Sequence, residues 1–145
     1  MQPPKYIYPS PIDNPNREWP GRSIAHSPAW CSVDLRDGNQ SLPNPMTPTA
    51  KMEYFKLLEK IGFREIEVAF PSASQDDFDF TRRLVDEGHL ADDMFIGGLT
   101  QCREHLISRT FEAFDGAPRA IVHTYIATSQ LHMQQVFGMT AEQTL

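Results

Sequence analysis

The segment Ser32–Leu42, with the sequence SVDLRDGNQSL, places charged and amide side chains directly after a short apolar run. Asp34, Arg36 and Asp37 bring two carboxylates and a guanidinium close together, and Gly38 follows them. Such a group can be structural, because Asp-Gly favours a bend and one guanidinium can satisfy two acids. It can also be chemical, with a carboxylate that holds a divalent cation beside a guanidinium that stabilises a developing oxyanion. The segment alone leaves both interpretations open.

Polar residues also follow later apolar runs. In REIEVAFPS, the two-residue alternation places Glu65 and Glu67 on one face, where pairing with an interior Arg or Lys is the expected role. MFIGGLTQC contains Gly97 and Gly98, which allow close approach of a backbone or ligand, or a barrel corner. AIVHTYIATS places His123 near its end, as either a hydrogen-bonded core residue or a catalyst. Because all these residues fall at strand ends, we favour a common site.

The elements that must position these residues alternate along the chain. Apolar or alternating runs predict four strands, separated by stretches of helical spacing, at 30–36, 64–70, 94–99 and 119–126. This order predicts an α/β fold with right-handed βαβ units and parallel strands, as a doubly wound sheet or a (β/α)8 barrel. Active sites of both folds lie at the carboxyl ends of the strands. In the first strand, alternation directs Asp34 and Arg36 to the barrel interior and Val33 and Leu35 toward the helices.

Capping residues mark where the helices begin and end. Thr47 as N-cap, Pro48 at the first helical position and Gly62 as the stop define the first helix. The second begins after Ser74 and stops at Gly88. The expected buried stripe of the first helix is Tyr54, Phe55, Leu58 and Ile61. That of the third is Leu106, Ile107, Thr110, Phe111 and Phe114.

Composition excludes several functional classes. The net charge of -6 argues against nucleic-acid binding, because the 13 Lys and Arg residues are scattered along the chain. We find no signal peptide, transit peptide or transmembrane pattern, and we expect a cytoplasmic protein without a membrane partner. Cys31 and Cys102 are too few for a disulfide scaffold and are not spaced as a zinc site. The sequence also lacks G-x-G-x-x-G, G-x-S-x-G, P-loop and H-E-x-x-H motifs.

The chain divides into two parts. Residues 1–29 are rich in proline and predict an extended arm, with Tyr6–Tyr8 and Trp19 as anchors on a neighbouring surface. Residues 30–145 predict four βα units. A complete barrel has eight such units and roughly 250 residues. Thr140 and Gln143 form a capping box that opens a helix at the end of the sequence. We therefore expect 30–145 to be the incomplete N-terminal half of a barrel.

Four segments carry a family resemblance. SVDLRDGNQSL, EIEVAFPSASQDDFDF, LTQCRE and GAPRAIVHTYIATS resemble successive strand-end motifs of the 2-isopropylmalate synthase family of metal-dependent, Claisen-condensing (β/α)8 TIM barrels. The resemblance runs from Trp30 to the C-terminus. It implies an acyltransferase that condenses acetyl-CoA with 2-ketoisovalerate to 2-isopropylmalate and CoA in leucine biosynthesis. It also implies a divalent metal ion, Mg2+, Mn2+ or Zn2+.

The resemblance assigns roles to individual residues. Arg36 stabilises the keto or enolate oxygen, Asp37 is a metal ligand, and Gln40 supports the site. Glu67 is carried over only weakly. The substrate pocket falls on Leu99, His123 and Tyr125. His123 is also a candidate for the general base, on geometry alone.

The sequence departs from the family pattern as well. The paired metal histidines, spaced H-x-H, are missing, and Gln130 stands where an acid is common. We expect the full-length enzyme to be a homodimer and this segment to be inactive alone. Alternatives are a sister synthase for another 2-keto acid, such as homocitrate or citramalate synthase, or a non-catalytic half-barrel that dimerises through its sheet edges.

Overall fold

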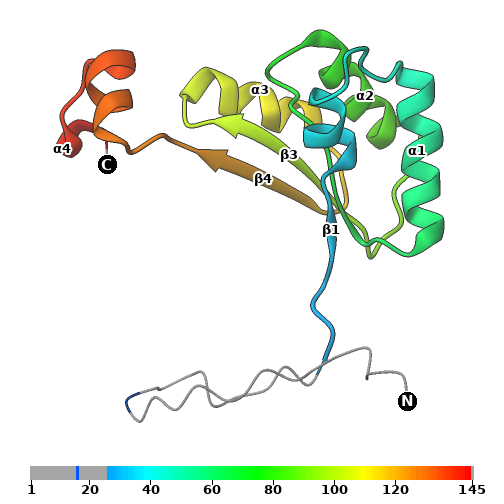
Figure 1. Cartoon of the computed structure of the whole chain (residues 1–145). Coiled ribbons are helices and arrows are strands. Elements are labelled where there is room, and N and C mark those ends of the chain that lie inside the picture. Colours follow the sequence, from blue (N-terminus) through cyan, green and yellow to red (C-terminus); the bar gives the residue numbers. More distant parts are fainter. Residues whose placement is uncertain (1–15, 17–25, 145) are drawn as a thin grey trace.

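The chain folds around one parallel sheet. The computed structural model describes residues 16 and 26–144, so most of the predicted arm over 1–29 lies outside the described residues. The strands, in sheet order, are β1 (Cys31–Ser32), β2 (Glu65–Ala69), β3 (Phe95–Gln101) and β4 (Ala120–Tyr125) (Figure 1). All three pairings are parallel and join strands that are consecutive in sequence. This order confirms the predicted α/β class and is that of the first βα units of a TIM barrel.

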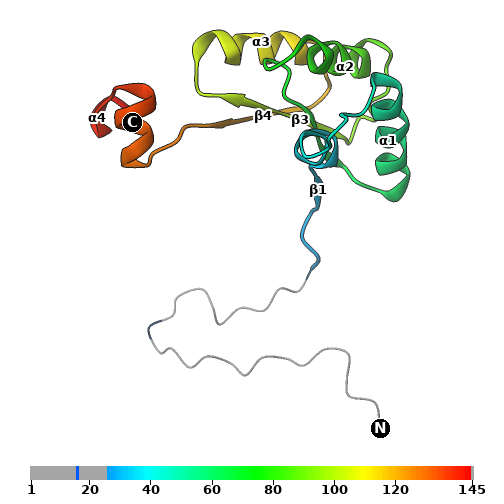
Figure 2. The same cartoon turned by 45° about the horizontal axis from the view of Figure 1, so that its top comes forward.

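Three helices cover one face of the sheet. They are α1 (Pro48–Ile61), α2 (Gln75–Asp86) and α3 (Glu104–Phe114), and they lie on the same side of the strands in both views (Figures 1 and 2). The core between the two layers is apolar, with Phe55, Phe80, Leu84, Ile66, Val68 and Ile96 almost fully buried. The opposite face of the sheet is left for the polar residues of the strands.

The predicted helix caps are confirmed. Thr47 Oγ1 accepts a hydrogen bond from Ala50 N at 3.3 Å, and Ser74 Oγ accepts one from Asp77 N at 3.1 Å. Gly62, with φ of 110°, follows α1 in the left-handed conformation that glycine adopts without strain. Local side-chain chemistry therefore fixes where these helices start and stop.

Two residues of the predicted stripes are exposed. Ile61 and Phe111 are 63% and 59% exposed, so their assignment to the core is wrong. Ile61 is the last residue of α1 and lies beyond the part of the helix that packs on the sheet. On α3 the buried residues are Thr110, Ala113 and Phe114, so the buried face of the helix does not include position 111.

The end of the first strand also differs from the prediction. β1 stops at Ser32, and the π-helical turn η1 (Asp34–Gly38) follows, with Val33 O accepting three backbone N–H groups. Two-residue alternation ends where the backbone coils, so Leu35 is fully buried and Val33 is 42% exposed. Asp34 does not join the inward-facing charged residues; it accepts a 2.6 Å hydrogen bond from Ser32 Oγ.

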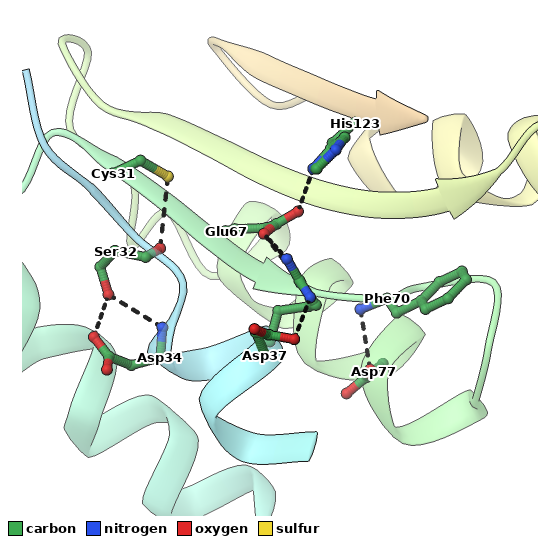
Figure 3. A network of polar contacts seen from close by, with 9 residues as sticks. Cys31, Ser32, Asp34, Asp37, Glu67, Phe70, Asp77 and His123 are labelled. Atoms are coloured by element: carbon green, nitrogen blue, oxygen red, sulfur yellow. Dashed lines mark hydrogen bonds and ion pairs between the residues drawn. The ribbon is translucent and has the colours of Figure 1, made fainter. Parts of the chain in front are cut away.

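A buried ion pair ties the helix layer to β2. Lys51 on α1 is 4% exposed, and its Nζ lies 2.5 Å from Asp77 Oδ1 on α2. The other oxygen of Asp77 accepts the backbone N–H of Phe70, directly after β2, at 3.0 Å (Figure 3). One carboxylate therefore holds two helices and the carboxyl end of a strand together.

The chain beyond β4 contains the short helical elements η2 (His132–Phe137) and α4 (Ala141–Thr144). The predicted capping box is confirmed, because Thr140 N donates to Gln143 Oε1 at 2.9 Å and Gln143 N donates to Thr140 Oγ1 at 3.3 Å. Both elements lie beyond the carboxyl end of β4, away from the three-helix layer (Figure 1). Within the described part of the chain, none of the helices has the length and apolar character needed to cross a membrane.

The two glycines of β3 have different surroundings, which leads to a prediction. A Cβ at Gly98 would lie 2.7 Å from Phe114 Cζ and 3.2 Å from Pro71 Cδ, whereas one at Gly97 meets nothing closer than 3.4 Å. Gly98→Ala is expected to lower the free energy of unfolding by about 1–3 kcal/mol through overpacking. Urea denaturation followed by circular dichroism measures it.

Gly97→Ala is the matched control and is expected to cost less. Adding Phe114→Leu to Gly98→Ala should recover part of the loss, because it removes the ring that the new methyl group meets. Equal stability of the two alanine variants would contradict this explanation of Gly98.

Candidate active site

A buried carboxylate forms the centre of a charged network at the polar face of the sheet. Glu67 on β2 is 5% exposed. Its Oε2 accepts hydrogen bonds from Arg36 Nε at 3.0 Å and Arg36 Nη2 at 2.6 Å, and its Oε1 lies 3.1 Å from His123 Nδ1 (Figure 3). Three separate parts of the chain, η1, β2 and β4, are joined at one side chain.

Asp37 extends the network toward solvent. Arg36 Nη1 donates to Asp37 Oδ1 at 2.7 Å, and the Asp37 side chain is 63% exposed, whereas that of Arg36 is 13% exposed. Arg36 therefore links one buried and one exposed carboxylate. It is the kind of partner that a buried acid needs, because an unpaired buried charge is costly.

Gly97 lies on β3 between the two strands that this network joins. β3 lies between these strands, with Gly97 in register with Glu67 and Leu99 in register with His123. A Cβ at Gly97 would lie 3.4–3.6 Å from Glu67 Cα, Cβ and Cγ, so the glutamate side chain runs close past this position. The carboxylate of Glu67 reaches across β3 to the imidazole of His123.

Most of the predicted site residues lie together. Glu67 joins Arg36 and His123, and Arg36 in turn pairs with Asp37; the predicted pairing of Glu67 with an interior Arg is confirmed. Leu99 lies beside His123 in the β3–β4 register. Arg36 arrives from a helical turn rather than from an inward-facing strand position, so its predicted route to the site is wrong.

Gln40 is placed differently from the other site residues. It is exposed, and within the described residues no hydrogen bond joins it to Arg36, Glu67 or His123. Its neighbour Asn39 is 8% exposed, and its Oδ1 accepts from Met46 N at 2.7 Å. Asn39 thus ties the end of η1 to the start of α1, a role that the sequence analysis did not assign to it.

A pocket lies where β3 and β4 end and the chain continues into η2. It has a volume of about 500 Å3 and lies at the carboxyl ends of β3 and β4, lined by Gln101, Tyr125, Ile126, His132, Phe137 and Met139. Its lining is mostly apolar, and Tyr125 and His132 are among the lining residues. The predicted substrate-binding residue Tyr125 therefore lines a cavity of the size of a small ligand.

The described residues do not by themselves make a metal site. Across residue 16 and residues 26–144, no three His, Cys, Asp or Glu side chains are grouped to hold a metal ion. Asp37 offers one exposed carboxylate, and its Oδ1 is already paired with Arg36. This donor set does not fit a complete metal centre, which needs further ligands.

Cys31 lies at the start of β1, in register with Glu65. Burial raises the pKa of the Cys31 thiol, and the nearby carboxylate of Glu65 raises that pKa further, because both disfavour the thiolate. In a Cys102→Ser variant, alkylation of Cys31 by iodoacetamide is expected to reach its half-maximal rate at a higher pH in the folded chain than in urea. Mass spectrometry of the pH series measures this.

Removing the acid supplies the control. Glu65→Gln should move the midpoint of the folded chain down in pH, whereas Glu53→Gln, on the exposed side of α1, should not move it. Identical midpoints for the folded and urea-treated chain would contradict the assigned cause.

The parallel sheet, its single helix layer and the charged network near the strand ends define an α/β protein built as the first units of a TIM barrel. The chain belongs to the HMGL-like family, which matches residues 27–145. It is 56% identical over 131 residues to 2-isopropylmalate synthase of Agrobacterium fabrum, covering 90% of this chain and 23% of the relative.

Two further relatives carry the same name. The chain is 54% identical over 133 residues to 2-isopropylmalate synthase of Bifidobacterium longum subsp. infantis, covering 92% of this chain and 21% of the relative. It is 56% identical over 135 residues to that of Paraburkholderia xenovorans, covering 93% and 24%. The chain thus spans less than a quarter of the length of the curated relatives it matches.

Proposed function

We propose that this chain supplies the first four βα units of a 2-isopropylmalate synthase, which condenses acetyl-CoA with 2-ketoisovalerate and then hydrolyses the resulting thioester with one water to give 2-isopropylmalate and CoA. The observation that carries the proposal is the buried Glu67 carboxylate, which holds Arg36 and His123 together at the polar face of the sheet. The identity of more than half of the matched residues to proteins of that name supports the choice of reaction.

Arg36 is the residue that would meet the oxygen of the keto acid. A guanidinium has five N–H groups, and three of those of Arg36 bind Glu67 and Asp37. Two N–H groups remain for a substrate oxygen whose negative charge grows as the new carbon–carbon bond forms. Because both carboxylates fix the guanidinium beforehand, little reorganisation is needed when that charge develops.

His123 is positioned for proton transfer. A carboxylate only accepts hydrogen bonds, so the contact with Glu67 Oε1 places the proton of a neutral imidazole on Nδ1 and leaves Nε2 as an acceptor. The His123 side chain is 55% exposed, so a substrate can reach it. We propose that Nε2 removes a methyl proton from the acetyl thioester. Leu99 and Tyr125 are proposed to contact the alkyl group of the keto acid.

Asp37 is proposed as one ligand of a divalent metal ion. Its exposed carboxylate has the oxygen chemistry that Mg2+ or Mn2+ prefers and that Zn2+ accepts. A complete site needs further ligands, because no group of three such side chains is found among the described residues. The supporting role of Gln40, the cytoplasmic location and the homodimer remain predictions.

A chimera tests the proposed reaction. The segment of the Agrobacterium fabrum relative that matches this chain is replaced by this chain, and thiol release is followed with acetyl-CoA and 2-ketoisovalerate. The expected result is release of CoA above a control without keto acid, and none from this chain alone. The unmodified relative is the positive control.

The choice of keto acid separates the alternatives. Pyruvate and 2-ketoglutarate are tested in the same chimera, because a sister synthase would prefer one of them. A folded chimera that prefers another keto acid would replace the proposed substrate. A folded chimera without any condensation would contradict the proposal and favour a non-catalytic half-barrel.

A further inference from the structure

A second charged group, on the helix side of the sheet, is joined to the strand that carries Glu67. Asp77 on α2 accepts the backbone N–H of Phe70 at 3.0 Å, and Phe70 directly follows β2, three residues after Glu67. The other oxygen of Asp77 lies 2.5 Å from Lys51 Nζ. Figure 3 shows the contact between Asp77 and Phe70 together with the charged network. The reaction proposed above assigns no part to Asp77.

The pairing of β2 with β3 is irregular just after Glu67. Glu67 lies opposite Gly97, but Ala69 lies opposite Gly98, so β2 has one extra residue, Val68, between these two pairs. An extra residue of this kind forms a β-bulge, which disrupts the ladder locally and bends the strand. Val68 and Ala69 are both fully buried in the apolar core, although neighbouring residues of a regular strand point to opposite faces. Glu67 is therefore the last residue of β2 on the polar face.

Asp77 holds the chain directly after the bulge. A bulge interrupts the backbone hydrogen bonds between two strands, so the strand end beyond it needs another anchor. The hydrogen bond from Phe70 N to Asp77 is such an anchor, because α2 packs on the sheet through fully buried residues. A second contact supports the same loop, since the hydroxyl groups of Ser72 and Thr100 lie 3.2 Å apart.

The carboxylate of Asp77 is itself held by a buried cation. The side chains of Lys51 and Asp77 are 5% and 20% exposed, and Lys51 Nζ also lies 5.2 Å from the centre of the Phe80 ring. Burying two charges is costly, and apolar residues of similar volume are often at least as stabilising. Stability alone therefore does not explain the pair. The pair does fix one acceptor oxygen at the backbone N–H of Phe70.

We propose that Asp77 is a positioning residue for the candidate active site. Its hydrogen bond with Phe70 N fixes the bulge and the direction of the Glu67 carboxylate, which in turn orients Arg36 and His123. Without that bond, the end of β2 moves against β3 and the contact between Glu67 and His123 Nδ1 weakens. The effect on catalysis rests on the reaction proposed above, whereas the effect on the geometry does not.

Two double variants separate the hydrogen bond from the charge pair. Lys51→Met with Asp77→Asn removes both charges but keeps an amide oxygen that can accept from Phe70 N. Lys51→Met with Asp77→Leu removes the charges and the acceptor, and its new side chain has a similar shape. Because neither variant leaves a buried charge unpaired, both are expected to fold, which circular dichroism checks.

Nitrogen-15 NMR of the chain reads the tautomer of the His123 ring at about pH 8, where an ordinary imidazole is neutral. The unchanged chain and the asparagine variant are expected to carry the proton on Nδ1, the atom that contacts Glu67. In the leucine variant, the proton should be shared between Nδ1 and Nε2. His123→Gln identifies the signal among those of the five histidines.

Kinetics of the chimera supply the second measurement. The leucine variant is expected to lower kcat by about 10–100-fold, because even a displacement of about 1 Å at the reacting groups can cost that much. KM should change by less than about twofold, and the asparagine variant should lower kcat by less than about threefold. Asp86→Asn is the control, because Asp86 lies on the same helix in an exposed ion pair with Arg82. It should change neither the tautomer nor kcat.

Other results overturn the proposal. A leucine variant that keeps the Nδ1 proton and full kcat would leave Asp77 with a structural role only. Equal losses in both double variants would assign the effect to the charge pair rather than to the bond with Phe70 N. A chimera that is folded but inactive before any of these substitutions would contradict the proposed reaction instead, and the NMR comparison would still decide the role of Asp77.

Discussion

Glu67→Ala is expected to lower the free energy of unfolding by about 3–5 kcal/mol, the cost of removing one partner from a buried ion pair. The Arg36 and Glu67 side chains are 13% and 7% exposed, so water cannot replace the lost carboxylate. The substitution also removes the partner of His123 Nδ1. Urea denaturation of the chain, followed by circular dichroism, measures the change.

Two variants test the physical reason. Asp37→Ala removes the exposed carboxylate of the same guanidinium and is expected to cost about 1 kcal/mol or less. Arg36→Met combined with Glu67→Met should recover most of the loss, because apolar residues of similar volume replace the whole pair. If Glu67→Ala costs no more than Asp37→Ala, the buried network is not the stabilising element described here.

Arg36→Lys is expected to reduce kcat for the condensation in the chimera by about 10²–10³-fold, the usual effect of losing one donor to an oxyanion. Lysine keeps the charge but lacks the planar fork with which Arg36 binds Glu67 through two N–H groups and Asp37 through a third. The loss should fall on kcat rather than on KM, since the charge on the substrate oxygen develops only in the transition state. Steady-state assays of CoA release measure both constants.

Arg64→Lys is the matched control. Arg64 pairs with Asp93 at the amino ends of the strands, and its side chain is 51% exposed. The substitution should leave kcat unchanged. An Arg36→Lys chimera that is folded and fully active would remove Arg36 from the chemistry.

Sequence reasoning predicted elements whose signals are local. Thr47, Ser74 and Gly62 mark helix ends through their own side chains or backbone freedom, so neighbouring residues suffice to predict them. The end of β1 was mispredicted because alternation continues in the sequence while the backbone coils after Ser32. Burial of Ala113 and exposure of Phe111 depend on which face of α3 packs on the sheet, and the local pattern placed that face one position away.

The candidate site shows the same division. Arg36, Asp37 and His123 were predicted as site residues because they lie near the ends of predicted strands. The sequence did not indicate that Glu67 binds two of them, because that contact depends on the register of β2, β3 and β4. Long-range pairing of this kind appears only when the strands are placed side by side.

The contact between Gly98 and Phe114 has a consequence for the evolution of the sequence. The aromatic ring of α3 rests against bare backbone of β3, so the two positions share one fixed volume. We expect them to covary among homologues: a larger residue at 98 should be accompanied by a smaller one at 114. The spacing between β3 and α3 therefore depends on the residues at positions 98 and 114 together, and evolution is expected to change them as a pair.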